Sequence, residues 1–219
     1  MSRIVVFGAG GRAGRAVTAE AVARGHEITA VVRDPARHAE FADGVEVVAG
    51  DVGDPASVAS VTRGHDAAVN AVSPASDPEA LKALGTLDAE VFSRAADALL
   101  ATGVSRLIAI GLFANLLGAD GRPIHDDPAA FPQELREFAL AHTAGLERLR
   151  AQGEDGVDWL MLTPPPALDV AGPRTGAYRL GGEELPEGEG LSYADLAVAV
   201  VDEIESPRHH RTRVSVTGA

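Results

Sequence analysis

The chain begins with an apolar run that leads directly into a glycine-rich turn. Residues 3–7 read Arg-Ile-Val-Val-Phe, which is typical of a buried strand, and residues 8–14 read Gly-Ala-Gly-Gly-Arg-Ala-Gly. A helix-forming stretch follows at residues 15–24. In this order the glycines let the backbone approach a phosphate closely, and the helix directs its free N–H groups and positive dipole end towards it. The pattern therefore predicts a dinucleotide-binding turn.

The composition narrows the class of protein. The chain has 219 residues, no cysteine and a net charge of −13. This length suits one domain, and we expect residues 1–219 to form it. The lack of cysteine excludes disulfides, thiolate catalysis and cysteine-bound metal. The negative charge disfavours nucleic acid and anionic membranes as partners. Because no membrane-spanning or signal-peptide pattern is present, we expect a soluble cytoplasmic protein.

Apolar runs alternate with helix-forming segments along the chain. The predicted strands cover residues 3–7, 26–32, 45–49, 66–72, 104–110, 157–162 and 213–216. The predicted helices cover residues 12–24, 55–62, 87–101, 134–152 and 193–205. Strands that are separated by helices and apolar throughout favour a parallel sheet covered on both faces. We therefore expect an α/β fold of the Rossmann type, with a doubly wound parallel sheet.

Capping residues mark several of the helix starts. Asp34 and Asp54 each precede a proline, as does Asp77 ahead of the helix expected at 87–101. An aspartate followed by proline is typical of an N-cap with proline at the first helical position. Ser192 precedes the last helix, with Asp195 at the capping-box position.

Two long stretches lack a regular pattern. Residues 111–133 follow the fifth strand and residues 163–190 follow the sixth. Loops of this length in a compact domain are usually functional, and ligands bind at the carboxyl ends of parallel strands. We expect these loops to form the substrate pocket without a separate second domain. Phe113 and Phe131 are candidates for an apolar wall of that pocket.

The residues around the glycine turn favour a particular cofactor. Arg33 follows the second strand, where the adenosine ribose is held in this fold, and a guanidinium suits a 2′-phosphate. Arg12 and Arg37 add positive charge nearby. Asp34 argues for the unphosphorylated ribose, but its proline neighbour offers it a capping role instead. The sequence therefore favours NADP(H) over NAD(H).

With these pieces in place, the chain resembles the atypical short-chain dehydrogenase/reductase superfamily. Within it, the chain is similar to the NAD(P)H-binding branch that includes NADH-flavin-reductase-like, biliverdin reductase B and NmrA-like proteins. The stretches that carry the resemblance are residues 8–14, 26–33, 45–54, 64–66, 157–165, 176–182 and 192–205.

The resemblance implies a set of cofactor-binding positions that runs across the sheet. The turn residues at the pyrophosphate would be Gly8, Gly11, Arg12 and Gly14, with Gly10 and Ala13 in the same turn. Arg33 would hold the 2′-phosphate, Asp51 and Val52 would lie near adenine, Ala71 and Val72 would line the middle of the cofactor, and Gly111 and Pro164 would lie near nicotinamide.

The catalytic pair of most of this superfamily, Tyr-x-x-x-Lys, is missing. Gly182 and Ala197 stand four residues after the two tyrosines, Tyr178 and Tyr193, and the single lysine, Lys82, lies elsewhere. In the helix where the resemblance places the pair, Phe138 and His142 lie one turn apart. The family's serine after the fifth strand is also absent, and Asn115 is the nearest polar residue.

Without that acid, hydride transfer to a planar acceptor such as a flavin or quinone is favoured, because water or histidine can supply the proton. His142 is the candidate acid, with a packing role as the alternative. Tyr178 is a candidate to stack on the acceptor or donate a hydrogen bond to it, and it could equally pack the second loop. His125, Asp126 and Asp127 are interpreted as a solvated turn rather than a metal site.

The alternative functions are a non-catalytic NADP(H)-binding regulator of the NmrA-like type and an epimerase or dehydratase acting on a nucleotide sugar. The missing catalytic pair motivates the first, and the short chain argues against the second. The sequence indicates no oligomeric state.

Overall fold

A computed structural model describes the chain apart from residues 39–40, 42–43, 75–86, 154–155 and 189. The capping prediction at Asp77 and the single lysine, Lys82, lie outside the described residues. In the described part, no helix is long and apolar enough to cross a bilayer.

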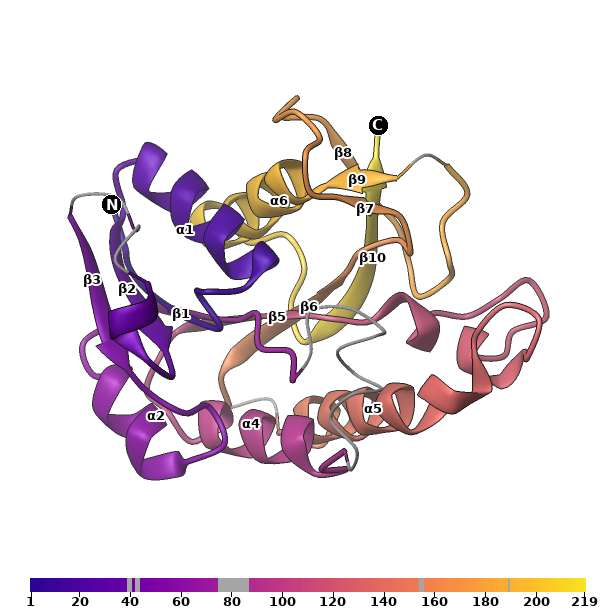
Figure 1. The fold of residues 1–219 in the computed structure, drawn as a ribbon, viewed down its shortest axis with the longest axis horizontal. Coiled ribbons are helices and arrows are strands. Elements are labelled where there is room, and N and C mark those ends of the chain that lie inside the picture. Colours follow the sequence, from indigo (N-terminus) through magenta and orange to yellow (C-terminus); the bar gives the residue numbers. More distant parts are fainter. Residues whose placement is uncertain (39–40, 42–43, 75–86, 154–155, 189) are drawn as a thin grey trace.

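The core of the molecule is an eight-stranded sheet in the described residues, in the order β3-β2-β1-β4-β5-β6-β10-β8 (Figure 1). The strands are β1 (Arg3–Phe7), β2 (Glu27–Val32), β3 (Val45–Ala49), β4 (Ala67–Asn70), β5 (Arg106–Ile110), β6 (Asp158–Thr163), β8 (Tyr178–Leu180) and β10 (Thr212–Gly218). β8 pairs antiparallel with β10, and the other neighbouring pairs are parallel. Strand order reverses between β1 and β4, which is the point where a doubly wound sheet binds its ligand.

Helices cover both faces of the sheet (Figure 1). One face carries α1 (Arg12–Ala23) and α6 (Tyr193–Glu205), and the other carries α2 (Pro55–Val61), α4 (Val91–Leu100) and α5 (Arg136–Arg150). Successive strand residues point to opposite faces. Accordingly Ile4 and Val6 belong to the core cluster that includes α1 and α6, whereas Val5 and Phe7 belong to the cluster that includes α4 and α5. Burial on both faces explains why the strands are apolar throughout.

The Rossmann-type fold predicted from the sequence is confirmed. The structure differs from the prediction in short strands that pair with segments distant in sequence. The stretch 163–190 contains β8 and also β7 (Leu168–Asp169), which pairs with β9 (Leu191–Ser192). These strands of two or three residues depend on partners distant in sequence, so they leave little local pattern. Asp34 and Asp54 cap as predicted, each accepting a hydrogen bond from the backbone N–H two residues on. The segment after Asp34 is only a single 3₁₀ turn, Pro35–Arg37.

The predicted capping box at α6 is half correct. The Ser192 hydroxyl accepts a hydrogen bond from the Asp195 backbone N–H at 2.9 Å. The Asp195 carboxylate instead accepts hydrogen bonds from the backbone N–H groups of Thr175 and Gly176, at 2.9 and 2.8 Å. It therefore anchors the loop that precedes β8.

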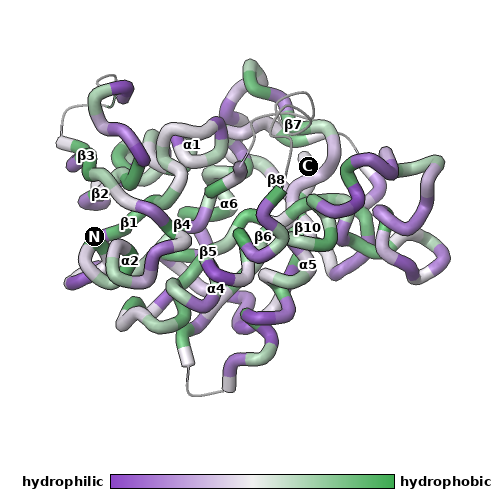
Figure 2. Tube along the Cα trace, turned by 60° about the horizontal axis from the view of Figure 1, so that its bottom comes forward, coloured by the Kyte–Doolittle hydropathy of each residue, from purple (hydrophilic) through white to green (hydrophobic). Residues whose placement is uncertain are grey.

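The loop at residues 111–133 is more ordered than its sequence suggests. It contains 3₁₀ turns at Phe113–Asn115 and Ile124–Asp126 and encloses a small core of its own with the start of α5. The buried members of that core are Ala114, Ile124, Phe131, Leu135 and Ala139. Its outer turns are largely hydrophilic in Figure 2.

Candidate dinucleotide-binding site

The glycine turn is packed so tightly that side chains are excluded. Gly8 has a φ of +74°, in the left-handed region that favours glycine, and a Cβ there would lie 2.7 Å from the Ala71 carbonyl oxygen. A Cβ on Gly14 would lie 2.2 Å from the Gly8 carbonyl oxygen. The Gly11 N–H donates to that same oxygen at 3.0 Å. The turn therefore brings the start of α1 directly against the end of β1.

The beginning of α1 has the features of an anion site. Its N-cap, Gly11, makes no side-chain capping bond, and the first turn contains no acidic residue. The first-turn N–H groups of a helix lack partners within the helix and carry partial positive charge. Within this cradle, the residues present fit a dinucleotide pyrophosphate, as the sequence predicted for Gly8 to Gly14.

Two side chains that the sequence reasoning missed also lie at this turn. The Arg15 Nε donates to the Gly10 carbonyl oxygen at 2.8 Å, and its Nη2 lies 3.2 Å from Nδ1 of His38. The His38 ring lies so close to Gly10 that a Cβ there would be 2.5 Å from Cε1. Arg15 could have been suspected from the sequence, because it follows Arg12 by three residues and so lies near it at the start of α1. Nothing local marked His38, because its contact depends on how the segment after β2 folds back.

The other predicted adenosine-side residues follow the ends of neighbouring strands. Arg33, directly after β2, is exposed, as are Arg12 and Arg37. Val52 is buried after β3, and Asp51 beside it accepts a hydrogen bond from the Gly53 N–H at 2.8 Å. All of them lie at the carboxyl edge of the sheet, where the adenosine half of a dinucleotide binds in this fold.

The predicted middle and nicotinamide positions continue along the same edge. The Ala71 N–H donates to the Phe7 carbonyl oxygen at 3.0 Å, which ties the loop after β4 to the end of β1. Gly111 follows β5, and a Cβ there would lie 2.3 Å from Oγ1 of Thr163, the last residue of β6. Pro164 comes next and is buried. The fold thus gathers the predicted cofactor positions into one row, while the contact of each with a cofactor stays a prediction.

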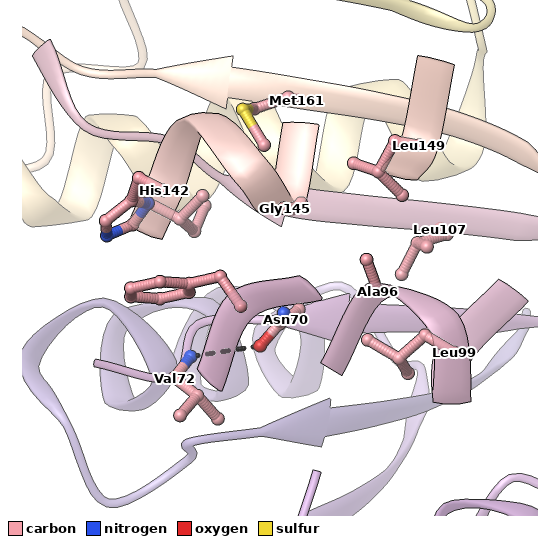
Figure 3. A pocket seen from close by; sticks show the side chains of 12 residues that line it. Asn70, Val72, Ala96, Leu99, Leu107, His142, Gly145, Leu149 and Met161 are labelled. Atoms are coloured by element: carbon pink, nitrogen blue, oxygen red, sulfur yellow. Dashed lines mark hydrogen bonds between the residues drawn. The ribbon is translucent and has the colours of Figure 1, made fainter. Parts of the chain in front are cut away.

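His142 lines a small, mostly apolar cavity beside this row (Figure 3). The cavity has a volume of about 20 Å³, enough for a single water molecule. It lies between α4, α5 and strands β4 to β6, and its lining residues are Asn70, Val72, Phe92, Ala96, Leu99, Leu107, Ala109, Ile110, His142, Gly145, Leu149 and Met161.

The surroundings of His142 are aromatic. Its ring stacks on Phe92 with centroids 3.6 Å apart at 31°, and Phe138 packs edge-on at 4.9 Å and 85°. Burial among these groups lowers the pKa of His142 to about 3. The imidazole is therefore neutral at physiological pH, which argues against the predicted role as a proton donor and fits the packing alternative.

Tyr178 lies away from the glycine turn. Its hydroxyl donates to Asp202 Oδ2 at 2.6 Å, and Asp202 Oδ1 accepts from Arg24 at the C-terminal end of α1. Burial and the Asp202 carboxylate raise the pKa of Tyr178 above its usual range. Because α1 has 12 residues, its two ends are about 18 Å apart. This position does not support a catalytic role for Tyr178, and it fits the alternative in which the residue holds down the second loop.

Three other candidates, Asn115, Phe131 and His125, are buried. Asn115 is buried, and its Nδ2 donates to the Ala139 carbonyl oxygen at 2.9 Å, so it is directed into α5 rather than towards the cofactor row. Phe131 packs edge-on against Phe113 within the loop core, at 5.9 Å, so only Phe113 remains a candidate for a pocket wall. His125 is buried, which corrects the interpretation of a solvated turn for this residue, whereas Asp127 is exposed, as that interpretation expects.

Asp126, beside His125, binds Arg136 at 2.7 Å. Within the described residues, no three histidine or acidic side chains gather in a metal-binding arrangement.

Comparison with known proteins agrees with this geometry. A family model described as NAD(P)H-binding matches residues 8–207, from the glycine turn to beyond α6. The chain belongs to this NAD(P)H-binding family. It is 32% identical to the uncharacterized protein YwnB of Bacillus subtilis over 219 residues, covering 98% of this chain and 97% of the relative.

Solved structures show the same fold across nearly the whole chain. One, named a "putative NADH-flavin reductase" from Streptococcus pneumoniae, has 28% identity and a TM-score of 0.78 and covers 100% of both chains. Another, named a "putative epimerase" from Bacteroides thetaiotaomicron, has 30% identity and a TM-score of 0.82 and covers 99% of this chain and 97% of that one. The similarity therefore supports an NAD(P)H-binding, oxidoreductase-like protein of the Rossmann type.

Proposed function

We propose that this protein is a reductase that transfers hydride from NADPH to a planar acceptor such as a flavin or a quinone. The observation that carries the proposal is the aromatic group formed by Phe92, Phe138 and His142. Phe138 and His142 on α5 stand at the helix positions where the resemblance places an acidic tyrosine and its lysine, and Phe92 on α4 packs against both. Phe138 has no proton to give, and burial keeps His142 neutral.

A site of this composition suits acceptors that need no strong protein acid. When bound, NADPH supplies the hydride, and the protein positions it and the acceptor. A flavin or quinone takes its accompanying proton from water. The reduction of a simple carbonyl is disfavoured here, because neither Phe138 nor the neutral His142 would readily protonate the developing alkoxide. The same argument disfavours sugar epimerisation.

The preference for NADPH rests on charge. Arg12, Arg33 and Arg37 are exposed near the predicted ribose position in a chain whose net charge is −13. Asp34, which would favour an unphosphorylated ribose, accepts a hydrogen bond from the Ala36 N–H at 3.1 Å. Its carboxylate thus has a local structural role.

To test the proposal, NADPH fluorescence is recorded while protein, FMN and a simple quinone are added in that order. The same series is then repeated with NADH. We expect enhanced emission on adding protein and protein-dependent decay with an acceptor, faster with NADPH. The variant His142→Phe should retain turnover within a few-fold, because the neutral ring donates no proton. Loss of turnover in this variant with intact NADPH binding would overturn the proton-from-water mechanism.

The absence of the Tyr-x-x-x-Lys pair, whose expected helix positions hold Phe138 and the neutral His142, favours a second candidate, a non-catalytic NADP(H)-binding regulator. Under this alternative, NADPH emission would be enhanced but would not decay with any acceptor, and NADP⁺ and NADPH would differ in their effect on the affinity for a partner protein.

A further inference from the structure

Arg15 and His38 form a small cluster on the outer side of the glycine turn. Arg15 belongs to the first turns of α1, whereas His38 follows the 3₁₀ turn after β2. Beyond their contacts with Gly10 and each other, both face Phe41: the Arg15 guanidinium lies 5.7 Å from its ring centroid, and the His38 ring lies 6.2 Å from it. These contacts hold two nitrogen-rich side chains together at the entrance to the anion site.

The contact between them joins two side chains that can both donate hydrogen bonds. Arginine has donors and no acceptor, so in this contact the His38 Nδ1, 3.2 Å from the Arg15 Nη2, has the role of acceptor. An anion placed between the two groups would accept from both, because a protonated imidazole and a guanidinium are each charged donors.

The location of the cluster indicates which anion it fits. Gly10 is part of the turn, and the backbone from the end of β2 runs through Arg33 to His38. The adenosine ribose of a dinucleotide binds between these two segments, with its 2′ position towards the residues after β2. Among the residues that the structure describes, the charged groups on the surrounding elements include Arg12 on α1, Arg33 and Asp34 after β2, and Arg37 in the 3₁₀ turn.

We propose that Arg15 and His38 bind the 2′-phosphate of NADP(H), and that His38 takes up a proton when this phosphate binds. The inference rests on the proposed use of NADP(H) by the site. It adds two specificity-determining residues to the predicted arginines and makes the preference for NADP(H) over NAD(H) dependent on pH. Lower pH supplies the proton, so the preference strengthens as the pH falls from 8 towards 6.5.

The test is titration calorimetry of the whole protein with NADP⁺ and, separately, NAD⁺ at pH 7, each in two buffers of different ionisation enthalpy. The difference between buffers gives the number of protons taken up. We expect proton uptake with NADP⁺ and none with NAD⁺. Arg15→Met should weaken NADP⁺ binding about tenfold or more and leave NAD⁺ within twofold. His38→Gln should remove the share of the proton uptake that belongs to His38, leaving only that of the 2′-phosphate, and should weaken NADP⁺ binding several-fold.

Matched controls separate this effect from general charge removal. Arg63 is exposed, as is His210, and both lie outside the turn. Arg63→Met and His210→Gln should leave NADP⁺ affinity and proton uptake unchanged. The 2′-phosphate itself also titrates near pH 6, and His38→Gln measures that contribution directly.

Three outcomes would overturn the inference. Equal proton uptake with NAD⁺ would assign the cluster to the pyrophosphate. Unchanged uptake in His38→Gln would exclude this histidine, and parallel loss of both dinucleotides in Arg15→Met with a lowered melting temperature would show a merely structural role. The proposed function is tested separately by turnover. Proton-linked NADP⁺ binding without any turnover would refute the reductase and leave this inference standing.

Discussion

Replacing Gly14 by alanine tests whether the tight glycine turn forms the cofactor site. The new Cβ would lie 2.2 Å from the Gly8 carbonyl oxygen and 2.7 Å from the Ala9 Cα. Both are backbone atoms, so neither can rotate away, and the start of α1 must move from the end of β1 by about an ångström. Overpacking of this kind costs about 1–3 kcal/mol. Alanine gains back about 0.5–1 kcal/mol in helix propensity.

The net destabilisation is therefore about 0–2.5 kcal/mol. With about 2.1 cal/mol/K of unfolding entropy per residue over this chain, the melting temperature should fall by at most about 5 °C. The larger effect should be on binding. The N–H groups at the start of α1 are displaced relative to Gly8, and we expect NADPH affinity to fall at least tenfold, on the order of 1.4 kcal/mol.

The assay is thermal unfolding by circular dichroism together with a fluorescence titration of NADPH. Gly103→Ala is the matched control, because a Cβ there meets nothing within 4 Å. It should bind NADPH normally and melt within about a degree of the wild type. If Gly14→Ala also bound NADPH with unchanged affinity, the turn would not be the phosphate site and the reasoning from its packing would be refuted.

Three further predictions concern groups outside the turn. His142, with a pKa lowered to about 3, stays neutral in the folded protein while the unfolded chain binds a proton below about pH 6.5, so stability should fall on acidification. Between pH 7 and 5, the free energy of unfolding measured in denaturant titrations should fall by roughly 1–2 kcal/mol less in His142→Phe than in the wild type. An equal fall in both proteins would contradict the lowered pKa of His142. Tyr178→Phe removes the bond to Asp202 and should lower the melting temperature by about 2–4 °C, with turnover unchanged within twofold; a large loss of turnover would restore the catalytic role. Glu203→Gln removes one of the two carboxylates that pair with the buried Arg106, at 3.0 Å, while Asp158 stays paired with it at 2.7 Å. The free energy of unfolding in urea should fall by about 1–3 kcal/mol with NADPH affinity intact, whereas an unchanged free energy would show the Glu203 pair to be dispensable.

The residues that could be placed from the sequence are those whose surroundings are local. The strand, the glycine turn and α1 are consecutive in the chain, so their order alone predicted the turn. The Asp34 and Asp54 caps each act two residues along the backbone, and both are confirmed. The alternation of buried strands with helices likewise predicted the doubly wound sheet.

The residues that could not be placed depend on contacts between distant segments. The His38 ring reaches Arg15 across 23 residues, and the Tyr178 hydroxyl reaches Asp202 across 24. No local pattern indicates such partners, because each of these side chains is equally compatible with solvent, packing or catalysis until a neighbour is known. The neutral state of His142 has the same origin, since it follows from burial against Phe92 on a different helix.

The sequence by itself determined the fold class and the position of the phosphate-binding turn, because backbone conformation and strand burial leave periodic and local signals. Only the tertiary structure decided which side chains stand at the site. It placed Tyr178 at the far end of α1, directed Asn115 into α5, and brought Arg15 and His38 to the turn. The physical reason is that protonation, burial and hydrogen bonding depend on which surfaces meet when the segments pack, and those surfaces come from residues far apart in the chain.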